Sequence, residues 1–158
     1  MWRIVLILSI AFTGCTGAVR ASIIRVVRLP PPGASKTSVV AQFPTAIPAA
    51  NPEGPDQNDL MCEVSIPVES LKVAGLEFLL DRERLVSSRI SFQTLSGAPA
   101  RHDEIVATLI ARLGAPVVSD RCIVKFNVAE GQLTVFDTRV ELEAASASDL
   151  EPALLHCK

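Results

Sequence analysis

Apolar and polar residues alternate along several short stretches in the C-terminal two thirds of the chain. A period of two is typical of a strand that is buried on one face only. The pattern therefore predicts about five strands, which short loops would join into an antiparallel sheet. The predicted strands are Cys62–Val68, Val73–Leu80, Leu85–Phe92, Cys122–Val128 and Leu133–Leu142.

One stretch, His102 to Leu113, instead places its apolar residues at the spacing of a one-sided helix. Gly114 and Pro116 favour an end to the helix there. A capping pattern at Ser148 predicts a short final helix over residues 149–156. We therefore expect an α+β domain over residues 60–158, with a small antiparallel sheet of about five strands and one main helix packed on one face.

The apolar pattern also predicts how the strands pair, because a slip of one residue would move apolar side chains to the wrong face. In the second hairpin a two-residue loop at Glu130–Gly131 would pair Val128 with Leu133, with Gly131 supplying a positive φ. After Asp137 the apolar residues shift from odd to even positions in the alternation, which predicts a bulge or a new strand there. In the first hairpin the expected pairs are Leu80 with Val86, Leu76 with Ile90 and Ala74 with Phe92.

The first 20 residues follow a different pattern. Arg3 precedes an unbroken run of apolar and small residues from Ile4 to Gly14, which is 11 residues long. A helix that spans a bilayer needs about 20 residues. A charged start, a short apolar middle and a small-residue end are typical of a secretory signal peptide, which we place at residues 1–21.

The end of this leader contains the residues Phe12-Thr13-Gly14-Cys15. They resemble the lipobox of bacterial lipoproteins, although Leu is usual where Phe12 stands. The resemblance implies cleavage after residue 14 and a lipid on Cys15, which would attach the protein to a membrane. In the alternative, ordinary cleavage after Ala18 or Ala21 removes Cys15 with the leader.

Basic residues around the apolar run favour another alternative. Arg20, Arg25 and Arg28 follow the run, whereas only Arg3 precedes it. Because the end richer in Lys and Arg tends to stay in the cytoplasm, an uncleaved anchor with a cytoplasm-facing domain is one alternative. An organelle transit peptide is another, since residues 1–52 contain no acidic residue.

Prolines concentrate between the leader and the predicted strands. Residues 30–55 hold seven of the eleven prolines in the chain. Each proline fixes φ and removes a hydrogen-bond donor, so such a stretch is a poor helix or central strand. We therefore predict a Pro/Ala-rich flexible linker over residues 22–59.

Three cysteines, Cys62, Cys122 and Cys157, would remain in the folded part after export. A disulfide is expected in an oxidising compartment, where it stabilises a small domain by about 2–4 kcal/mol. We predict the pair Cys122–Cys157, which would fix the last helix, with Cys62–Cys157 as the alternative. If the domain stays in the cytoplasm, all three are buried thiols.

Composition and motifs exclude several function classes. Residues 53–158 carry 10 basic and 17 acidic side chains, a net charge of −7, which disfavours a nucleic-acid partner. No Cys-x-x-Cys pair or Gly-x-Ser-x-Gly motif occurs. The run His102-Asp103-Glu104 fits helix capping better than catalysis, because three consecutive residues do not face one point. We therefore expect no catalytic residue, no metal and no cofactor.

These features together predict an exported protein of the bacterial envelope, in the periplasm or anchored to a membrane by lipid. Its expected role is non-catalytic binding or scaffolding, with the membrane as one partner and a protein partner that the sequence does not identify. The alternatives are a small periplasmic enzyme or redox protein and a membrane-anchored domain that faces the cytoplasm.

Overall fold

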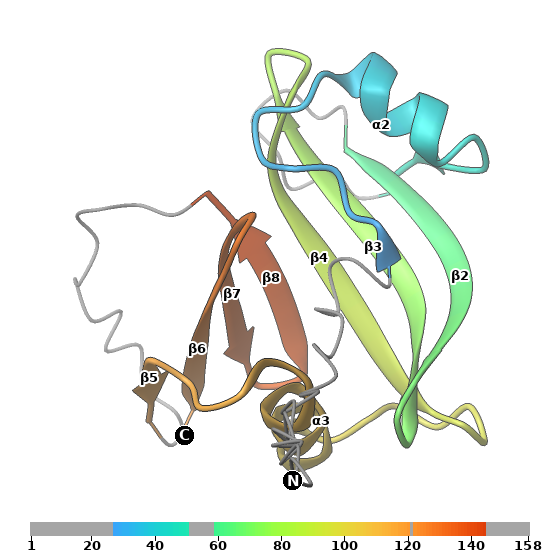
Figure 1. The fold of residues 1–158 in the computed structure, drawn as a ribbon. Helices are drawn as coiled ribbons and strands as arrows, with labels where there is room; N and C mark the ends of the chain where they lie inside the picture. The colour runs from blue at the N-terminus through green and yellow to red at the C-terminus, as the bar shows by residue number, and fades with distance from the viewer. Residues whose placement is uncertain (1–26, 51–58, 121, 145–158) are drawn as a thin grey trace, which may run out of the picture.

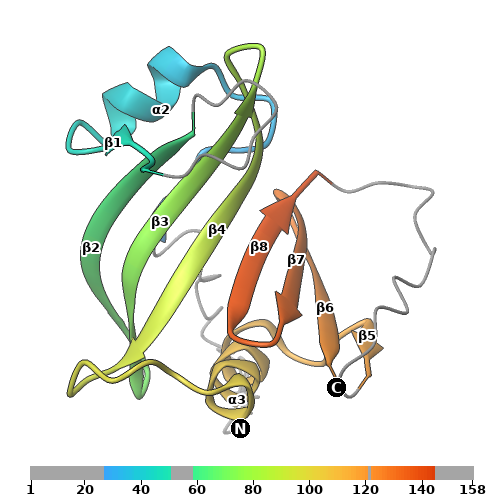
Figure 2. The same ribbon diagram turned by 180° about the vertical axis from the view of Figure 1, so that it is seen from behind.

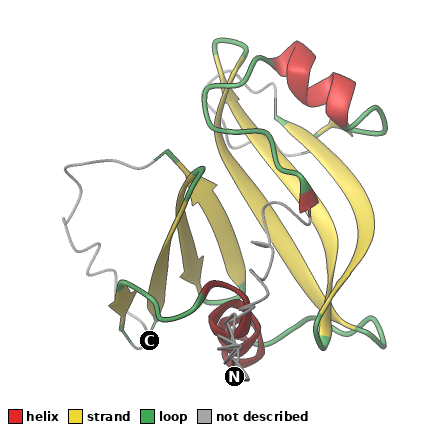
Figure 3. Cartoon of the chain, in the orientation of Figure 1, coloured by secondary structure: helices red, strands yellow, loops and turns green. Residues whose placement is uncertain are grey.

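The computed structural model describes residues 27–50, 59–120 and 122–144. Within these residues the chain forms one 8-stranded antiparallel sheet with the strand order β1-β2-β3-β4-β8-β7-β6-β5 (Figures 1 and 3). The helices are α2 (Lys36–Gln42) and α3 (His102–Leu113). The strands are β1 (Ile47–Pro48), β2 (Leu60–Val68), β3 (Leu71–Asp81), β4 (Arg84–Thr94), β5 (Val118–Ser119), β6 (Ile123–Val128), β7 (Gly131–Phe136) and β8 (Arg139–Glu143).

The prediction of a five-stranded sheet with one main helix is wrong, because the described sheet has eight strands and two short helices accompany it. Two of the additional strands, β1 and β5, are two residues long and too short to show a period of two. The third arises because the predicted strand Leu133–Leu142 turns at Asp137 and Thr138 and becomes β7 and β8. Of the two predicted outcomes at this point, a new strand is the one observed.

The sheet consists of two meanders that meet at a single strand pair. The first is β1–β4 and the second is β5–β8, and α3 connects them in the sequence. The last strand of each meander forms the joint, where residues 87–90 of β4 pair with residues 140–143 of β8. Figure 2 shows β4 continuing beyond this pairing, so the two meanders diverge from the joint.

The apolar core lies on one face of this sheet. Residues 27–35 cross the face of β3 and β4 that is toward the viewer in Figure 1 and lie behind the strands in Figure 2. The helix α2 contributes the fully buried Val39, and α3 contributes Ile105 and Leu109. Phe78 from the first meander and Phe126 from the second belong to the same buried cluster, so one core stabilises both meanders.

The structure differs from the linker prediction over residues 27–50. Val27, Leu29 and Val39 are buried in the core, and α2 and β1 lie in this stretch. The Oγ of Ser35 accepts a hydrogen bond from the N–H of Ser38 at 3.2 Å, which starts α2 just after the prolines at 30–32. Proline content alone was misleading, because prolines outside a regular element do not prevent the neighbouring residues from packing.

Residues 33–36 also extend the pairing of β4. The N–H of Gly33 donates to the carbonyl of Leu85 at 2.7 Å, and the N–H of Leu85 donates to the carbonyl of Ala34 at 2.8 Å. These contacts lie at the start of β4, before the residues that pair with β8. At the end of β4, after those residues, Gln93 pairs with Pro99. Separate segments therefore satisfy the edge of β4 that β8 leaves free.

The predicted registers are partly correct. The pair Leu76–Ile90 is confirmed, whereas bulges in β3 and β4 shift its predicted neighbours, so that Phe92 faces Val73. In the second hairpin Val128 faces Gly131, so the turn lies one residue earlier than predicted. A Cβ at Gly131 would overlap the backbone oxygen of Glu143, so this glycine permits a close approach of strands.

The predicted helix over residues 102–113 is confirmed as α3. A carboxylate oxygen of Glu104 accepts a hydrogen bond from the N–H of Arg101 at 2.9 Å, and Gly114 ends the helix with φ of 90°. The predicted final helix over residues 149–156 lies outside the described residues. Neither described helix combines the length and the hydropathy needed to cross a membrane.

Candidate functional site

The face of the sheet opposite the core carries a line of charged side chains across the joint. Glu77 of β3 lies opposite Arg89 of β4, and Arg89 lies opposite Glu141 of β8. Residues directly opposite in adjacent strands share a face, so the three side chains are neighbours. Together with Ser87 they form what we term the charged row.

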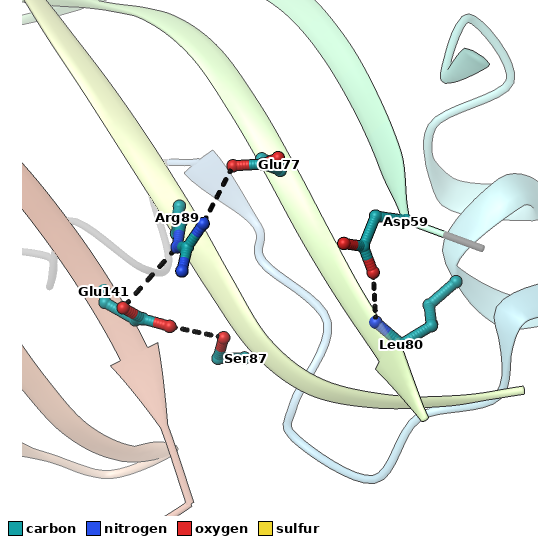
Figure 4. A network of polar contacts seen from close by, with 6 residues as sticks. All are labelled: Asp59, Glu77, Leu80, Ser87, Arg89 and Glu141. Atoms are coloured by element: carbon teal, nitrogen blue, oxygen red, sulfur yellow. Dashed lines mark hydrogen bonds and ion pairs between the residues drawn. The ribbon is translucent and has the colours of Figure 1, made fainter. Parts of the chain in front are cut away.

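Direct contacts connect these side chains (Figure 4). The Nη1 of Arg89 lies 3.5 Å from a carboxylate oxygen of Glu77, and its Nε lies 3.6 Å from one of Glu141. The hydroxyl of Ser87 donates a hydrogen bond of 2.6 Å to the other oxygen of Glu141. The guanidinium therefore lies between carboxylates from two different meanders.

The charged row is only partly open to solvent. The side chain of Arg89 is 14% exposed, and those of Glu77 and Glu141 are 30% and 21% exposed. Ion pairs at this depth are screened less than fully exposed ones. The arrangement strengthens the joint and also leaves carboxylate oxygens at the surface that can accept hydrogen bonds from a partner.

The row continues across the second meander. Glu141 lies opposite Thr134, which in turn lies opposite Lys125. Glu143, two residues further along β8, faces Ser87 and Gln132. Burial raises the pKa of Glu143 above its usual value, and the charge of Glu141 adds to this, while Lys125 and Arg89 act in the opposite direction. This part of the face therefore has a carboxyl group that is easier to protonate than an ordinary one.

The cysteines singled out by the sequence have different environments. Cys62 in β2 is a buried free thiol, and its Sγ lies 3.1 Å from the hydroxyl of Thr45. Cys122, just before β6, is disulfide-bonded. Cys15, the lipidation candidate, and Cys157 lie outside the described residues. The pairing of Cys122 with Cys157 and the lipid on Cys15 therefore stay predictions.

The residues around the start of α3 make separate contacts. The Nδ1 of His102 lies 2.6 Å from the carbonyl oxygen of Asp137, and Asp103 pairs with Arg101 at 3.2 Å. Glu104 accepts a hydrogen bond from the backbone N–H of Arg101 at the start of the helix. Over the described part of the chain, no three His, Cys, Asp or Glu side chains are grouped so that they could hold a metal ion.

The sequence did not predict the charged row. Glu77 and Arg89 occupy the outward positions of their predicted strands, which is a visible signal, but Glu141 joins them only because β8 pairs with β4. No pattern in the sequence states which strand follows β4 across the sheet. Neither a protein-family model, nor a curated protein, nor a solved structure matches this chain.

Proposed function

We propose that this chain is an exported protein of the bacterial envelope with a non-catalytic binding or scaffolding role. In this proposal a lipid on Cys15 anchors the mature protein, and the folded residues present the face of the charged row to a protein partner. The leader pattern of residues 1–15 supports the export step.

The observation that carries the proposal is the disulfide of Cys122. Structural disulfides persist in oxidising compartments such as the periplasm and are rare in the reducing cytoplasm. A leader followed by a domain with a disulfide is the combination expected of an exported protein. Cys62 is protected from the same oxidation, because it is buried beneath Thr45.

Support for a binding role comes from the face of the sheet that no described segment covers, which we term the uncovered face. Residues 27–35 and α2 pack on the opposite face, as Figures 1 and 2 show. Exposed or half-exposed polar side chains line the uncovered face in register, among them Glu63, Glu77, Ser91 and Lys125. A broad face with charges of both signs suits recognition of a complementary protein surface.

The export step is tested by the mature N-terminus. Intact-mass analysis of the protein from bacterial membranes should give a chain that begins at an acylated Cys15, and globomycin should cause the unprocessed precursor to accumulate. Cys15→Ala should release the protein from the membrane fraction without unfolding it. A full-length chain with Met1 recovered from the cytoplasm would contradict the proposal.

The binding role is tested by site-specific photo-crosslinking in cells. A photoreactive amino acid at Ser91, which is exposed on the uncovered face, should give one discrete crosslinked species. The matched control is Ala107, which is exposed on α3 and away from this face. Equal crosslinking at both positions, or crosslinking at Ala107 alone, would assign the partner to another surface.

A further inference from the structure

One row of residues on the uncovered face crosses every strand of the described sheet. Each member lies directly opposite the next in the register, and residues directly opposite each other share a face. From β1 to β5 this row, which we term the long row, consists of Ile47, Met61, Glu77, Arg89, Glu141, Thr134, Lys125 and Val118. Its two carboxylates and two cations balance, so the long row has no net charge. Both of its ends are apolar.

The order of side chains along the long row is complementary to its own reverse. When the row is read backwards from the β4–β8 joint, Arg89 takes the place of Glu141, and Glu77 takes the place of Thr134. Arg89 would therefore meet Glu141 in a second row that runs the opposite way. Glu77 would meet the hydroxyl of Thr134, which can donate to a carboxylate. The apolar end at β1 would meet the apolar end at β5.

A two-fold axis between two copies imposes this reversal, because residue i of one copy then contacts residue j of the other, and j contacts i. The axis that reverses the long row runs parallel to the strands through the β4–β8 joint. Packed sheets keep their strands within about 30° of each other, so residues near the axis stay opposite.

Other positions of the axis fit the charges less well. An axis on β4 places Arg89 on Arg89, one on β8 places Glu141 on Glu141, and one between β3 and β4 places Glu141 on the apolar Met61. An axis parallel to the long row places each of its charges on a like charge. The order of the charges therefore favours the axis at the joint.

A second row places an exposed ring opposite a position without a side chain. Phe136 of β7 is 43% exposed. Gly75 of β3 and Phe136 both lie two residues from the long row, on the same side of it. The same axis therefore seats Phe136 of each copy over Gly75 of the other. Gly75 has no positive φ, and a Cβ there would meet only Ser91, at an ordinary 3.7 Å. The fold of one copy therefore does not itself require this glycine.

We propose that the protein partner of the uncovered face is a second copy of this chain, joined through the long row about a two-fold axis at the β4–β8 joint. The inference rests on the proposed function, because it names the partner that the binding role requires. Two Arg89 and two Glu141 side chains form an alternating group of four charges at the centre. On either side of it a Phe136 ring fills the space over Gly75.

The size of this contact indicates a weak dimer. Three rows of residues on β3, β4, β8, β7 and β6 cover roughly 500 Å² per copy, at about 4.8 Å between strands and about 6.6 Å between alternate residues. Stable interfaces of standard size bury about 800 Å² per partner. We therefore expect a dissociation constant in the micromolar range. Lipid anchors that hold two copies on one membrane raise their effective concentration and favour the dimer there.

Association is tested by sedimentation velocity on the purified mature chain with Cys15→Ala, which carries no lipid and needs no detergent. The sedimentation coefficient should rise from that of a monomer toward that of a dimer between about 1 and 500 μM protein. A monomer at every concentration in this range would overturn the inference.

Two variants locate the contact. Phe136→Ala should weaken association about tenfold, because buried aromatic side chains dominate interface energies. Gly75→Val should weaken it by a similar factor without lowering the melting temperature, since valine suits a strand better than glycine. The matched control is Ile110→Ala, which removes an equally exposed side chain from α3. Equal weakening by the control, or wild-type association of Gly75→Val, would overturn the proposed contact.

The direction of the axis is tested by mixing two variants that each carry one added cysteine. Face-to-face sheets lie about 10 Å apart, so a bismaleimide of about that span should link Glu77→Cys to Thr134→Cys in the mixture. Peptide mapping identifies the linked positions. Each variant alone should give far less linked product, because like positions lie on opposite sides of the axis. Efficient linkage of Glu77→Cys to itself would indicate another axis and overturn the proposed one.

The photo-crosslink at Ser91 separates failure of this inference from failure of the proposed function. A crosslinked species with twice the mass of the chain supports both. A discrete species of another mass keeps the binding role and overturns the second copy as the partner. Because sedimentation and linkage use purified protein, their outcomes are readable whether or not the chain is exported in cells.

Discussion

The two meanders of the sheet follow the same antiparallel rule but bend differently. The pairs β2–β3 and β3–β4 contain three register shifts, whereas the described pairs β5–β6, β6–β7 and β7–β8 contain none. Each bulge increases the local twist of a strand. Of the first meander, β2, β3 and β4 are accordingly long and curved in Figure 2, and the strands of the second meander are short and straighter.

The difference indicates which segment each meander packs against to complete the shared core. The first curves around α2 and residues 27–35, which come from earlier in the chain and supply Val39 and Leu29. The second packs on α3, which precedes it directly in the sequence. The curved strands enclose a segment from earlier in the chain, whereas among the described residues the short regular meander packs on the helix that precedes it.

The largest effect is expected from removing a buried ring from the shared core. Phe78→Ala in the first meander and Phe126→Ala in the second should each cost about 3–5 kcal/mol, because both rings are almost fully buried. Since one cluster joins both meanders, urea denaturation followed by circular dichroism should show a single transition in both variants. Two separate transitions would show that the meanders unfold independently.

The regular meander should be the less tolerant of an added methyl group. Gly131→Ala should cost roughly 2–4 kcal/mol, because its Cβ would overlap the backbone of Glu143 and the strands must separate. Gly97→Ala is the matched control, since it also has a positive φ but no atom lies near its Cβ. The control should cost about 1 kcal/mol. Equal losses measured by thermal denaturation would contradict the steric explanation.

The joint between the meanders should depend moderately on Arg89. Arg89→Met leaves Glu77 and Glu141 without the cation between them and should cost about 1–2 kcal/mol. The exposed pair Lys36–Glu83 serves as the control, and Lys36→Met should change stability by less than about 0.5 kcal/mol. Urea midpoints of the two variants test the contrast, and an Arg89 variant as stable as the control would mean that the backbone pairing alone holds the joint.

The smallest effect is a pH dependence at Glu143 in the second meander. Its raised pKa means that the folded state binds this proton more tightly than the unfolded state. Its contribution is therefore present at acid pH and is lost as the pH rises through the folded pKa. Glu143→Gln should gain stability relative to wild type as the pH rises from about 3 to 7. Urea midpoints of the variant and of the wild type across this pH range check the sign. A stability difference between the two that does not change with pH would show that Glu143 is not the source of the pH dependence.

Local patterns predicted the elements better than they predicted the assembly. The helix over residues 102–113 and the pair Leu76–Ile90 are as expected, because both depend on neighbours in the sequence. The number of strands was not predicted, because β1 and β5 are two-residue strands that are defined by their pairing with β2 and β6. The charged row escaped prediction for the same reason, since Glu141 reaches Arg89 through a strand pair between residues far apart in the chain.

The sequence by itself determined the existence of β3, β4 and α3 and most of the side chains that they bury, because periodicity decides the face that a local element turns toward the core. Bulges changed the rest, so that Val73 and Leu85 are buried where the pattern had placed Ala74 and Val86. It also contains the leader pattern and the cysteines on which the proposed export rests. The tertiary structure alone decided that residues 27–50 pack against the sheet, that β8 closes on β4 and that Arg89 lies between two carboxylates. These depend on contacts between distant residues, and their energy is available only after the intervening chain has folded.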